Sequence, residues 1–113
     1  MKFQKTPDHF QTEAQALEEI ANRGWHAIAS TFHPEKDLHW HDFDVVAFIL
    51  EGTASAEFDD GSIEEASAGA RVEAPAGIVH RNVGASFRAI LGVSVDPAKM
   101  TQPVNKPVVA GAK

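Results

Sequence analysis

Two histidines separated by a single residue are the first feature of this sequence that could do chemistry. His39 and His41 stand in the stretch LHWHDFDVVAFILEG, residues 38–52, which continues as an apolar run and ends at a glycine. On a β-strand, residues i and i+2 point to the same face of the sheet. Two imidazoles on one face can share a divalent ion, because neutral imidazole is a common metal ligand. The alternative is two ordinary polar residues at the edge of a strand.

A second stretch, GARVEAPAGIVH at residues 69–80, offers a third imidazole. Pro75 ends the strand that precedes it, because proline has no N–H to give to a β-ladder. Gly77 makes the following turn, and His80 begins the returning strand. We expect this hairpin to bring His80 across a β-barrel to face the first two histidines.

With these two stretches the sequence resembles the cupins, whose motifs are G-x5-H-x-H-x3-E-x6-G and G-x5-P-x-G-x2-H-x3-N. The positions that match, with their spacing kept, are His39, His41 and Gly52 in the first motif and Gly69, Pro75, Gly77 and His80 in the second. The resemblance covers about residues 25–95. It implies an all-β fold, a small jelly-roll-like cupin barrel, with a metal site formed by His39, His41 and His80 in its mouth.

The sequence departs from the first motif where that motif has its ligand glutamate, because this chain has Val45 there. Asp44 is adjacent, but strict alternation points it away from His41, and only a bulge would re-aim it as a fourth ligand. The resemblance therefore carries over three ligands. Three imidazoles leave coordination positions open for water, a substrate or O₂, and without the carboxylate the ion would favour an anionic substrate.

Two functions fit this pattern. The first is a metal-dependent enzyme acting on a small organic molecule, with non-haem oxygenase-type chemistry ahead of isomerase or lyase chemistry. Its cofactor would be a divalent metal ion, iron for an oxygenase, with nickel, zinc, manganese and copper as alternatives, since imidazole binds many of these ions. The second is a non-catalytic small-molecule-binding or sensor cupin, for which the loss of the glutamate at Val45 is an expected first step. No catalytic residue can be assigned.

The residues that alternate with His41 predict the wall of a substrate pocket. Phe43 and Val45 lie next to the ligands on the same strand face, so we expect them to line the pocket. Ala47 and Ile49 continue this face and are interpreted as ordinary core.

The rest of the chain predicts one domain, residues 1–113, made of one helix and many short strands. Residues 12–24 are typical of a helix, with Thr12 as N-cap, a final Gly24 and apolar residues at Leu17, Ile20 and Ala21. The strand-like segments that follow are 25–32, 45–52, 53–58, 62–66, 70–75, 78–83 and 87–95. Short strands with frequent turns predict an antiparallel sandwich or barrel, here with its core at about 25–95. We expect an irregular tail, 96–113, that is loosely held or packed on a neighbour.

Composition limits the partners. The formal net charge of −6 argues against nucleic acid and against anionic membranes, and the absence of cysteine excludes a thiolate ligand or nucleophile. The longest apolar run, Val45–Leu50, is far shorter than the roughly 20 residues of a membrane span, and residues 1–10 do not look like a signal peptide. We therefore expect a cytoplasmic protein with a small-molecule ligand. A homodimer is also expected, because small sandwiches leave strand edges that are usually covered.

Overall fold

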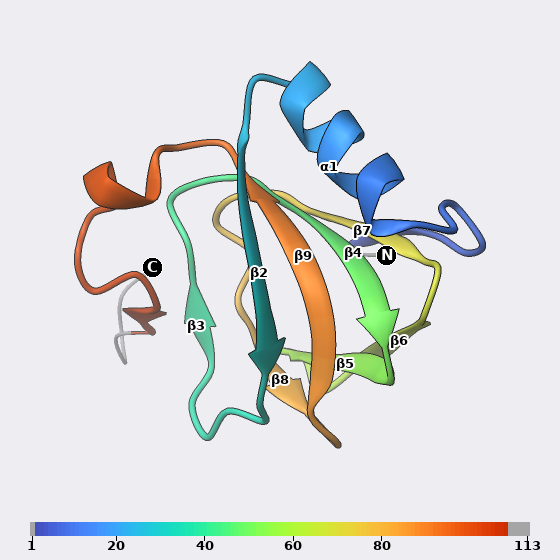
Figure 1. Cartoon of the computed structure of the whole chain (residues 1–113). Helices are drawn as coiled ribbons and strands as arrows, with labels where there is room; N and C mark the ends of the chain where they lie inside the picture. Colours follow the sequence, from blue (N-terminus) through green and yellow to red (C-terminus); the bar gives the residue numbers. More distant parts are fainter. Residues whose placement is uncertain (1, 109–113) are drawn as a thin grey trace.

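The computed structural model describes residues 2–108 as two antiparallel β-sheets packed face to face, with one α-helix against the outside of one sheet (Figure 1). Sheet A has the strand order β1 (Gln4–Thr6), β7 (Arg71–Ala74), β4 (Val45–Glu51), β9 (Phe87–Val93) and β2 (His26–Phe32). Sheet B has the order β10 (Lys106–Pro107), β3 (His39–Trp40), β8 (His80–Val83), β5 (Thr53–Phe58) and β6 (Ile63–Ser67). The predicted strands are confirmed to within a few residues at their ends. No helix among the described residues is long and apolar enough to cross a membrane.

Helix α1, Glu13–Asn22, begins where the sequence predicts. Thr12 and Gln15 form a capping box, in which each side chain accepts a hydrogen bond from the backbone N–H of the other. The predicted apolar face is partly wrong: α1 buries Ile20 and also Ala16, whereas Leu17 is 46% exposed and Ala21 is exposed too. The helix is rotated so that the face carrying Glu19 and Arg23 meets charged residues of sheet A, and this orientation turns Leu17 outward.

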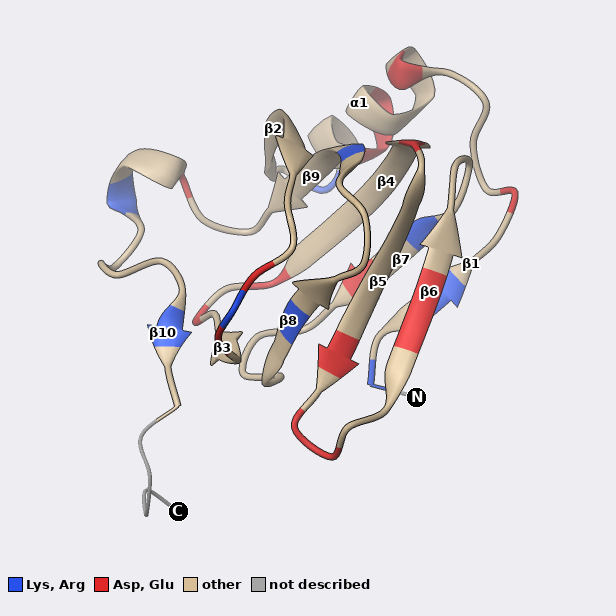
Figure 2. Cartoon of the chain, turned by 90° about the horizontal axis from the view of Figure 1, so that it is seen from below, with Lys and Arg blue, Asp and Glu red and all other residues tan. Residues whose placement is uncertain are grey.

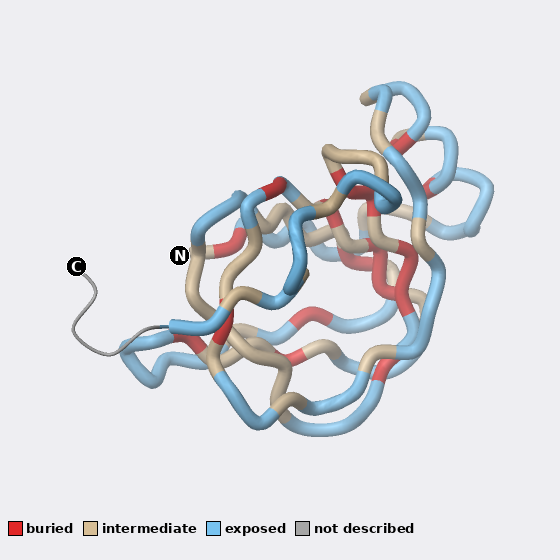
Figure 3. The backbone as a smooth tube through the Cα atoms, turned by 90° about the vertical axis from the view of Figure 1, so that its left-hand side faces the viewer, coloured by how far each residue is buried: buried red, intermediate tan, exposed pale blue. Residues whose placement is uncertain are grey.

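Strand β4 of sheet A is apolar on both faces, as the run from Val45 predicts. On the outer face, one buried cluster joins the helix to the sheet and consists of Ala16, Ile20, Val46, Phe48 and Ile90. On the inner face, a second cluster lies between the sheets and consists of Ile49, Ala66, Ala70, Phe87 and Ala89. The buried residues accordingly concentrate between the sheets and beneath the helix, whereas loops, the outer side of α1 and strands β1 and β2 are largely exposed (Figure 3).

Gly92 allows the helix to approach sheet A closely. A Cβ atom at this position would lie 2.8 Å from Cγ1 of Ile20 and 2.8 Å from Cγ1 of Val46, closer than real Cβ atoms come to other atoms. A glycine in the middle of a strand often marks such a close approach. Its role here is therefore packing between β9 and α1.

The chain beyond β9, expected as an irregular tail over residues 96–113, can be followed to residue 108, and residues 109–113 lie outside the described residues. A short 3₁₀ helix, Pro97–Lys99, is followed by β10, which pairs antiparallel with β3 so that Lys106 lies opposite Trp40. This pairing holds residues 100–107 against the edge of sheet B. The segment becomes part of the candidate site described next.

Candidate metal centre

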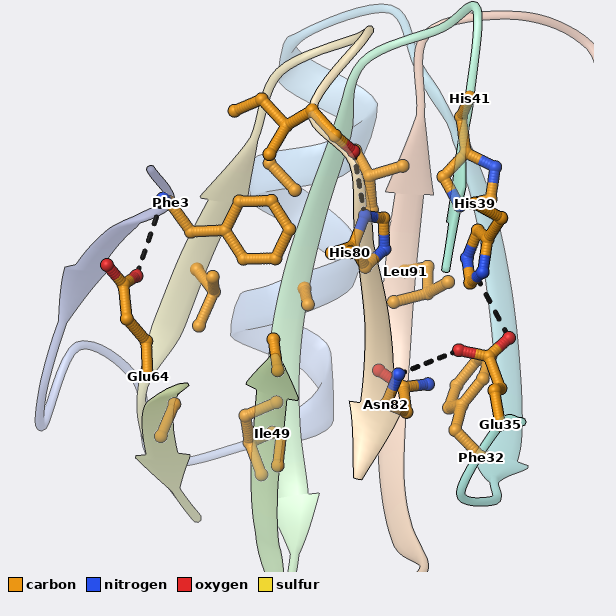
Figure 4. Close-up of a pocket in the computed structure, with 18 of the residues that line it drawn as sticks. Phe3, Phe32, Glu35, His39, His41, Ile49, Glu64, His80, Asn82 and Leu91 are labelled. Carbon is orange, nitrogen blue, oxygen red and sulfur yellow. Dashed lines mark hydrogen bonds and ion pairs between the residues drawn. The ribbon is translucent and has the colours of Figure 1, made fainter. Parts of the chain in front are cut away.

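The three predicted histidines come together on sheet B. His39 and His80 are direct cross-strand partners on β3 and β8, and His41 follows the end of β3. The ring centroids lie 4.6 Å apart for His39 and His80, 4.9 Å for His39 and His41, and 5.4 Å for His41 and His80. One nitrogen from each ring lies within 4.8 Å of the others, so the three can hold one metal ion (Figure 4).

The route by which His80 arrives differs from the expected hairpin. The turn at residues 75–79 carries the chain from β7 in sheet A to β8 in sheet B, so His80 stands beside His39 rather than across the barrel. Gly77 occupies the left-handed region at φ 85° and donates its N–H to the carbonyl of His41 at 2.8 Å. This bond fixes the crossover turn to the backbone of a candidate ligand.

Each imidazole is oriented by a backbone carbonyl oxygen next to its Nδ1 atom. The carbonyl of Asp37 lies 3.3 Å from Nδ1 of His39, that of Val104 3.0 Å from Nδ1 of His41, and that of Ile78 2.9 Å from Nδ1 of His80. Because a carbonyl only accepts, we assign the proton of each neutral ring to Nδ1. The Nε2 atoms are then unprotonated and able to bind a metal, as in metal-ligating histidines generally.

Burial favours the neutral, ligand-competent form of the His41 and His80 rings. Desolvation lowers the pKa of His41, and it lowers the pKa of His80 to about 4, in both cases against the opposing effect of the backbone hydrogen bond. The charge of a neighbouring protonated imidazole would lower both pKa values further. The donor set therefore fits a divalent ion, which requires deprotonated ligands.

A carboxylate that sequence reasoning missed lies beside the histidines. Glu35 belongs to the loop between β2 and β3, and its Oε2 atom is 3.8 Å from Nε2 of His39 (Figure 4). Its Oε1 atom accepts the backbone N–H of Asn82 at 2.9 Å, and Oε2 accepts from Nδ2 of Asn105 at 3.1 Å. Glu35 precedes His39 by four residues on a loop, where spacing does not fix a side chain's direction, so no sequence pattern would have identified it.

Asp44 does not take the place of the missing motif glutamate. Its side chain is at the surface, where Oδ1 accepts the backbone N–H of Ala76 at 2.9 Å, and its own N–H donates to Oγ of Ser94. It is not part of the group of histidines that could hold a metal. Val45, the residue at the motif position, faces the interior of the barrel.

The histidines line a cavity of about 320 Å³ between the two sheets. Phe43 and Val45 line this cavity, and the ring of Phe43 stacks on that of His41 with centroids 5.1 Å apart. Phe3 is a wall residue that the sequence did not reveal: it is buried, and its ring meets that of His80 edge to face at 5.1 Å. The other apolar lining residues include Ile28, Phe32, Ala47, Ile49, Val72, Phe87, Leu91 and Val93.

Fold and site together define a small cupin-like β-barrel with a three-histidine group able to bind metal. Protein NMB1881 from Neisseria meningitidis has a similar structure, with a TM-score of 0.55, 21% identity, and coverage of 61% of this chain and 72% of that one. A DUF861-family protein (TM1112) from Thermotoga maritima gives a TM-score of 0.54 and 19% identity over 79% of this chain and 96% of that one. The predicted cupin fold with a short N-terminal helix is thereby confirmed. No protein-family model and no curated protein matches the sequence.

Proposed function

We propose that this protein binds a divalent metal ion through His39, His41 and His80 and acts with it on a small, largely apolar organic molecule. One observation carries the proposal: three imidazoles, each oriented through Nδ1, converge in a cavity whose lining is mostly apolar. Within residues 2–108, no hydrogen bond satisfies the Nε2 atom of any of the three. Three unprotonated nitrogens facing one another are stabilised by a shared cation.

The charges around the cavity favour a substrate without a carboxylate. Arg81 is paired with Glu57, Arg88 is paired with Glu51, and Lys5, the one cationic side chain in the described lining, donates to the backbone carbonyl of Glu65. Acidic residues instead mark β6 and the end of β5 near this region (Figure 2). The expected preference for an anionic substrate is therefore replaced by one for a neutral apolar molecule with an oxygen atom that reaches the metal.

The chain's own contribution to the reaction is positioning and exclusion of water. The three imidazoles hold the ion, while the apolar wall that includes Phe43 and Val45 orients the substrate and keeps bulk water out. A bound divalent ion would supply Lewis acidity, and iron would add redox chemistry with O₂. Non-haem oxygenase-type chemistry is the leading reaction class, followed by isomerase or lyase chemistry with nickel, zinc, manganese or copper.

A non-catalytic binding or sensor role is the second candidate, and the apolar Val45 at the position of the motif glutamate favours it. Metal analysis of purified protein, followed by O₂ uptake with a panel of small aromatic and aliphatic alcohols, ketones and enols, separates the two functions. An oxygenase consumes O₂ only with metal and substrate together. A binding protein retains the metal and binds a panel compound without turnover.

Replacing the ligands tests the metal site itself. We expect stoichiometric metal in the wild-type protein and a loss of at least about tenfold in affinity in the His41→Ala and His80→Ala variants. Unchanged metal content in both variants would show that the ion, if present, is held elsewhere.

A further inference from the structure

We infer that Glu35 is a fourth ligand of the metal centre and replaces the glutamate that the first cupin motif places at the position of Val45. The inference rests on the proposed function, because it presupposes that the histidines hold an ion. It assigns the site's carboxylate to the loop between β2 and β3 instead of to a strand of sheet A.

The position of Glu35 is close to that of a ligand. Its Oε2 atom lies 3.8 Å from Nε2 of His39, the nitrogen that faces the site. Two atoms bound at roughly 2.1 Å to one ion are about 3.0 Å apart at a right angle and about 3.4 Å apart at a tetrahedral angle. A movement of less than about 1 Å would therefore bring this pair of atoms to ligand separation. Glu35 lies outside the group whose ligand atoms are all within 4.8 Å of one another, so its carboxylate must also turn toward His41 and His80 to share their ion.

The carboxylate is also held in place by two independent parts of the chain. The backbone N–H of Asn82, two residues after His80 on β8, binds Oε1, and the side chain of Asn105, just before β10, binds Oε2. The loop itself is tied down by the N–H of Glu35, which donates to the carbonyl of Asn82 at 2.8 Å. Holding a glutamate side chain in this way removes rotamer freedom before any metal arrives, which favours ligation.

Glu35 has no lysine or arginine partner among residues 2–108. Its side chain is 27% exposed, and the histidine beside it, His39, forms an ion pair with it only when protonated. A partly buried carboxylate is stabilised further by a cation than by hydrogen bonds from two neutral amides alone. A divalent ion on the histidines would supply the missing positive charge.

Moving the carboxylate from position 45 to the loop has a consequence for the pocket. Val45 stands on β4 of sheet A and lines the cavity, so the motif position contributes an apolar wall residue instead of a ligand. The centre keeps one negative ligand while the substrate side remains hydrophobic. This arrangement suits the neutral apolar substrate proposed above.

The test compares Co²⁺ binding by the full-length wild-type protein, Glu35→Gln and the control Asp44→Asn. Glutamine keeps the size of the side chain and can accept the Asn82 hydrogen bond, whereas Asp44 is a surface carboxylate next to the motif position. We expect Glu35→Gln to weaken Co²⁺ binding at least about tenfold and to change the visible absorption of the bound ion. Asp44→Asn should leave affinity and spectrum within about twofold of wild type.

The outcomes separate this inference from the proposed function. If wild-type protein binds no Co²⁺, both fail. If wild type binds Co²⁺ and Glu35→Gln has the wild-type spectrum, the three-histidine site stands and Glu35 is not a ligand. A crystal structure of Zn²⁺-loaded wild-type protein needs no variant: a Glu35 oxygen within about 2.2 Å of the ion supports the inference, and one beyond 3 Å overturns it.

Discussion

Sheet A contains three strands of seven residues each, β2, β4 and β9, and α1 covers its outer face. The candidate ligands of sheet B stand on or beside much shorter strands, because β3 has two residues and β8 has four. The largest fully buried side chains of sheet A include Phe48, Ile49, Ile90 and Val93. Strands β3 and β8 of sheet B pair through only one residue pair, His39 with His80, so neighbouring loops help to position the histidine rings. The 33–38 loop, the 75–79 turn and the 100–107 segment each contact a ligand or Glu35.

This difference suggests that sheet A mainly determines the stability of the fold and that sheet B mainly determines metal binding. Sheet A holds five of the seven largest fully buried side chains, and burial of apolar side chains is the main favourable contribution to folding. Sheet B places three polar rings at the edge of a cavity, where their alignment depends on hydrogen bonds from loops. We therefore expect substitutions in sheet A to lower the free energy of unfolding more than they lower metal affinity. Substitutions around β3 and β8 should lower metal affinity more than they lower the free energy of unfolding.

The largest expected effect on stability is that of Phe48→Ala. Phe48 is fully buried between sheet A and α1, and its ring meets that of Phe10 edge to face at 5.4 Å. Truncation should lower the free energy of unfolding by about 3–5 kcal/mol, measured by urea denaturation. The fraction that remains folded should bind as much Co²⁺ as wild type. A folded Phe48→Ala protein that binds no Co²⁺ would contradict the claim that sheet A acts on stability and not on metal binding.

Gly92→Ala should lower the free energy of unfolding by about 1–3 kcal/mol, because the added methyl group overlaps with Ile20 and Val46 where α1 packs on sheet A. Gly61→Ala is a contrasting variant: its Cβ would meet no atom within 4 Å, although its φ of 84° adds backbone strain. Comparing the two in thermal unfolding separates overpacking from strain. A Gly92→Ala protein as stable as wild type would mean that α1 can move away from β9 without cost.

Acid should weaken the junction between α1 and sheet A through Glu19. Burial opposes ionisation of this carboxyl, but hydrogen bonds from His9, Arg71 and Arg23 outweigh it and lower its pKa from 4.5 to about 2. Its folded pKa lies below the unfolded value, so its contribution is fully present above pH 4.5 and is lost as the pH falls towards 2. We expect this contribution to be about 1–3 kcal/mol. Glu19→Gln should reduce the pH dependence of urea unfolding in that window, and an unchanged profile would contradict the assignment.

The smallest expected change in stability is that of Phe43→Leu, at about 1 kcal/mol, because leucine keeps an apolar side chain in the cavity wall. Metal content should be unchanged, since no ligand is removed. The order of preference among the compounds used in the O₂-uptake panel should change, because the ring beside His41 is gone. Loss of the metal in this variant would show that the Phe43 ring is needed to hold His41 in place.

The sequence was most informative where periodicity and spacing determine the direction of a side chain. The apolar run from Val45 predicted a strand buried on both faces, and the motif spacings predicted that His39, His41 and His80 would meet. Glu35 could not be predicted in this way, because a loop has no fixed period. Its position depends on Asn82 and Asn105, which are distant in the chain.

The contacts of the terminal segments were equally hidden from the sequence. Phe3 reaches the cavity because β1 pairs with β7 at the edge of sheet A, and Val104 reaches His41 because β10 pairs with β3. Both pairings involve two or three residues, too few for a pattern. The helix was predictable in its extent, but its rotation is set by the ion pairs of Glu19 with Arg71 and of Arg23 with Glu73 on β7, which turn Leu17 outward.

The most direct test of the central claim is to record the ring-nitrogen chemical shifts of all six histidines by NMR, before and after stoichiometric Zn²⁺ is added to ¹⁵N-labelled protein. The account predicts that His39, His41 and His80 keep a protonated Nδ1 while their Nε2 signals move together on metal binding. The remaining three histidines, His9, His26 and His33, should be unaffected. Zn²⁺-dependent shifts confined to those three, or none at all, would contradict the claim that the paired sheet B histidines form a metal centre.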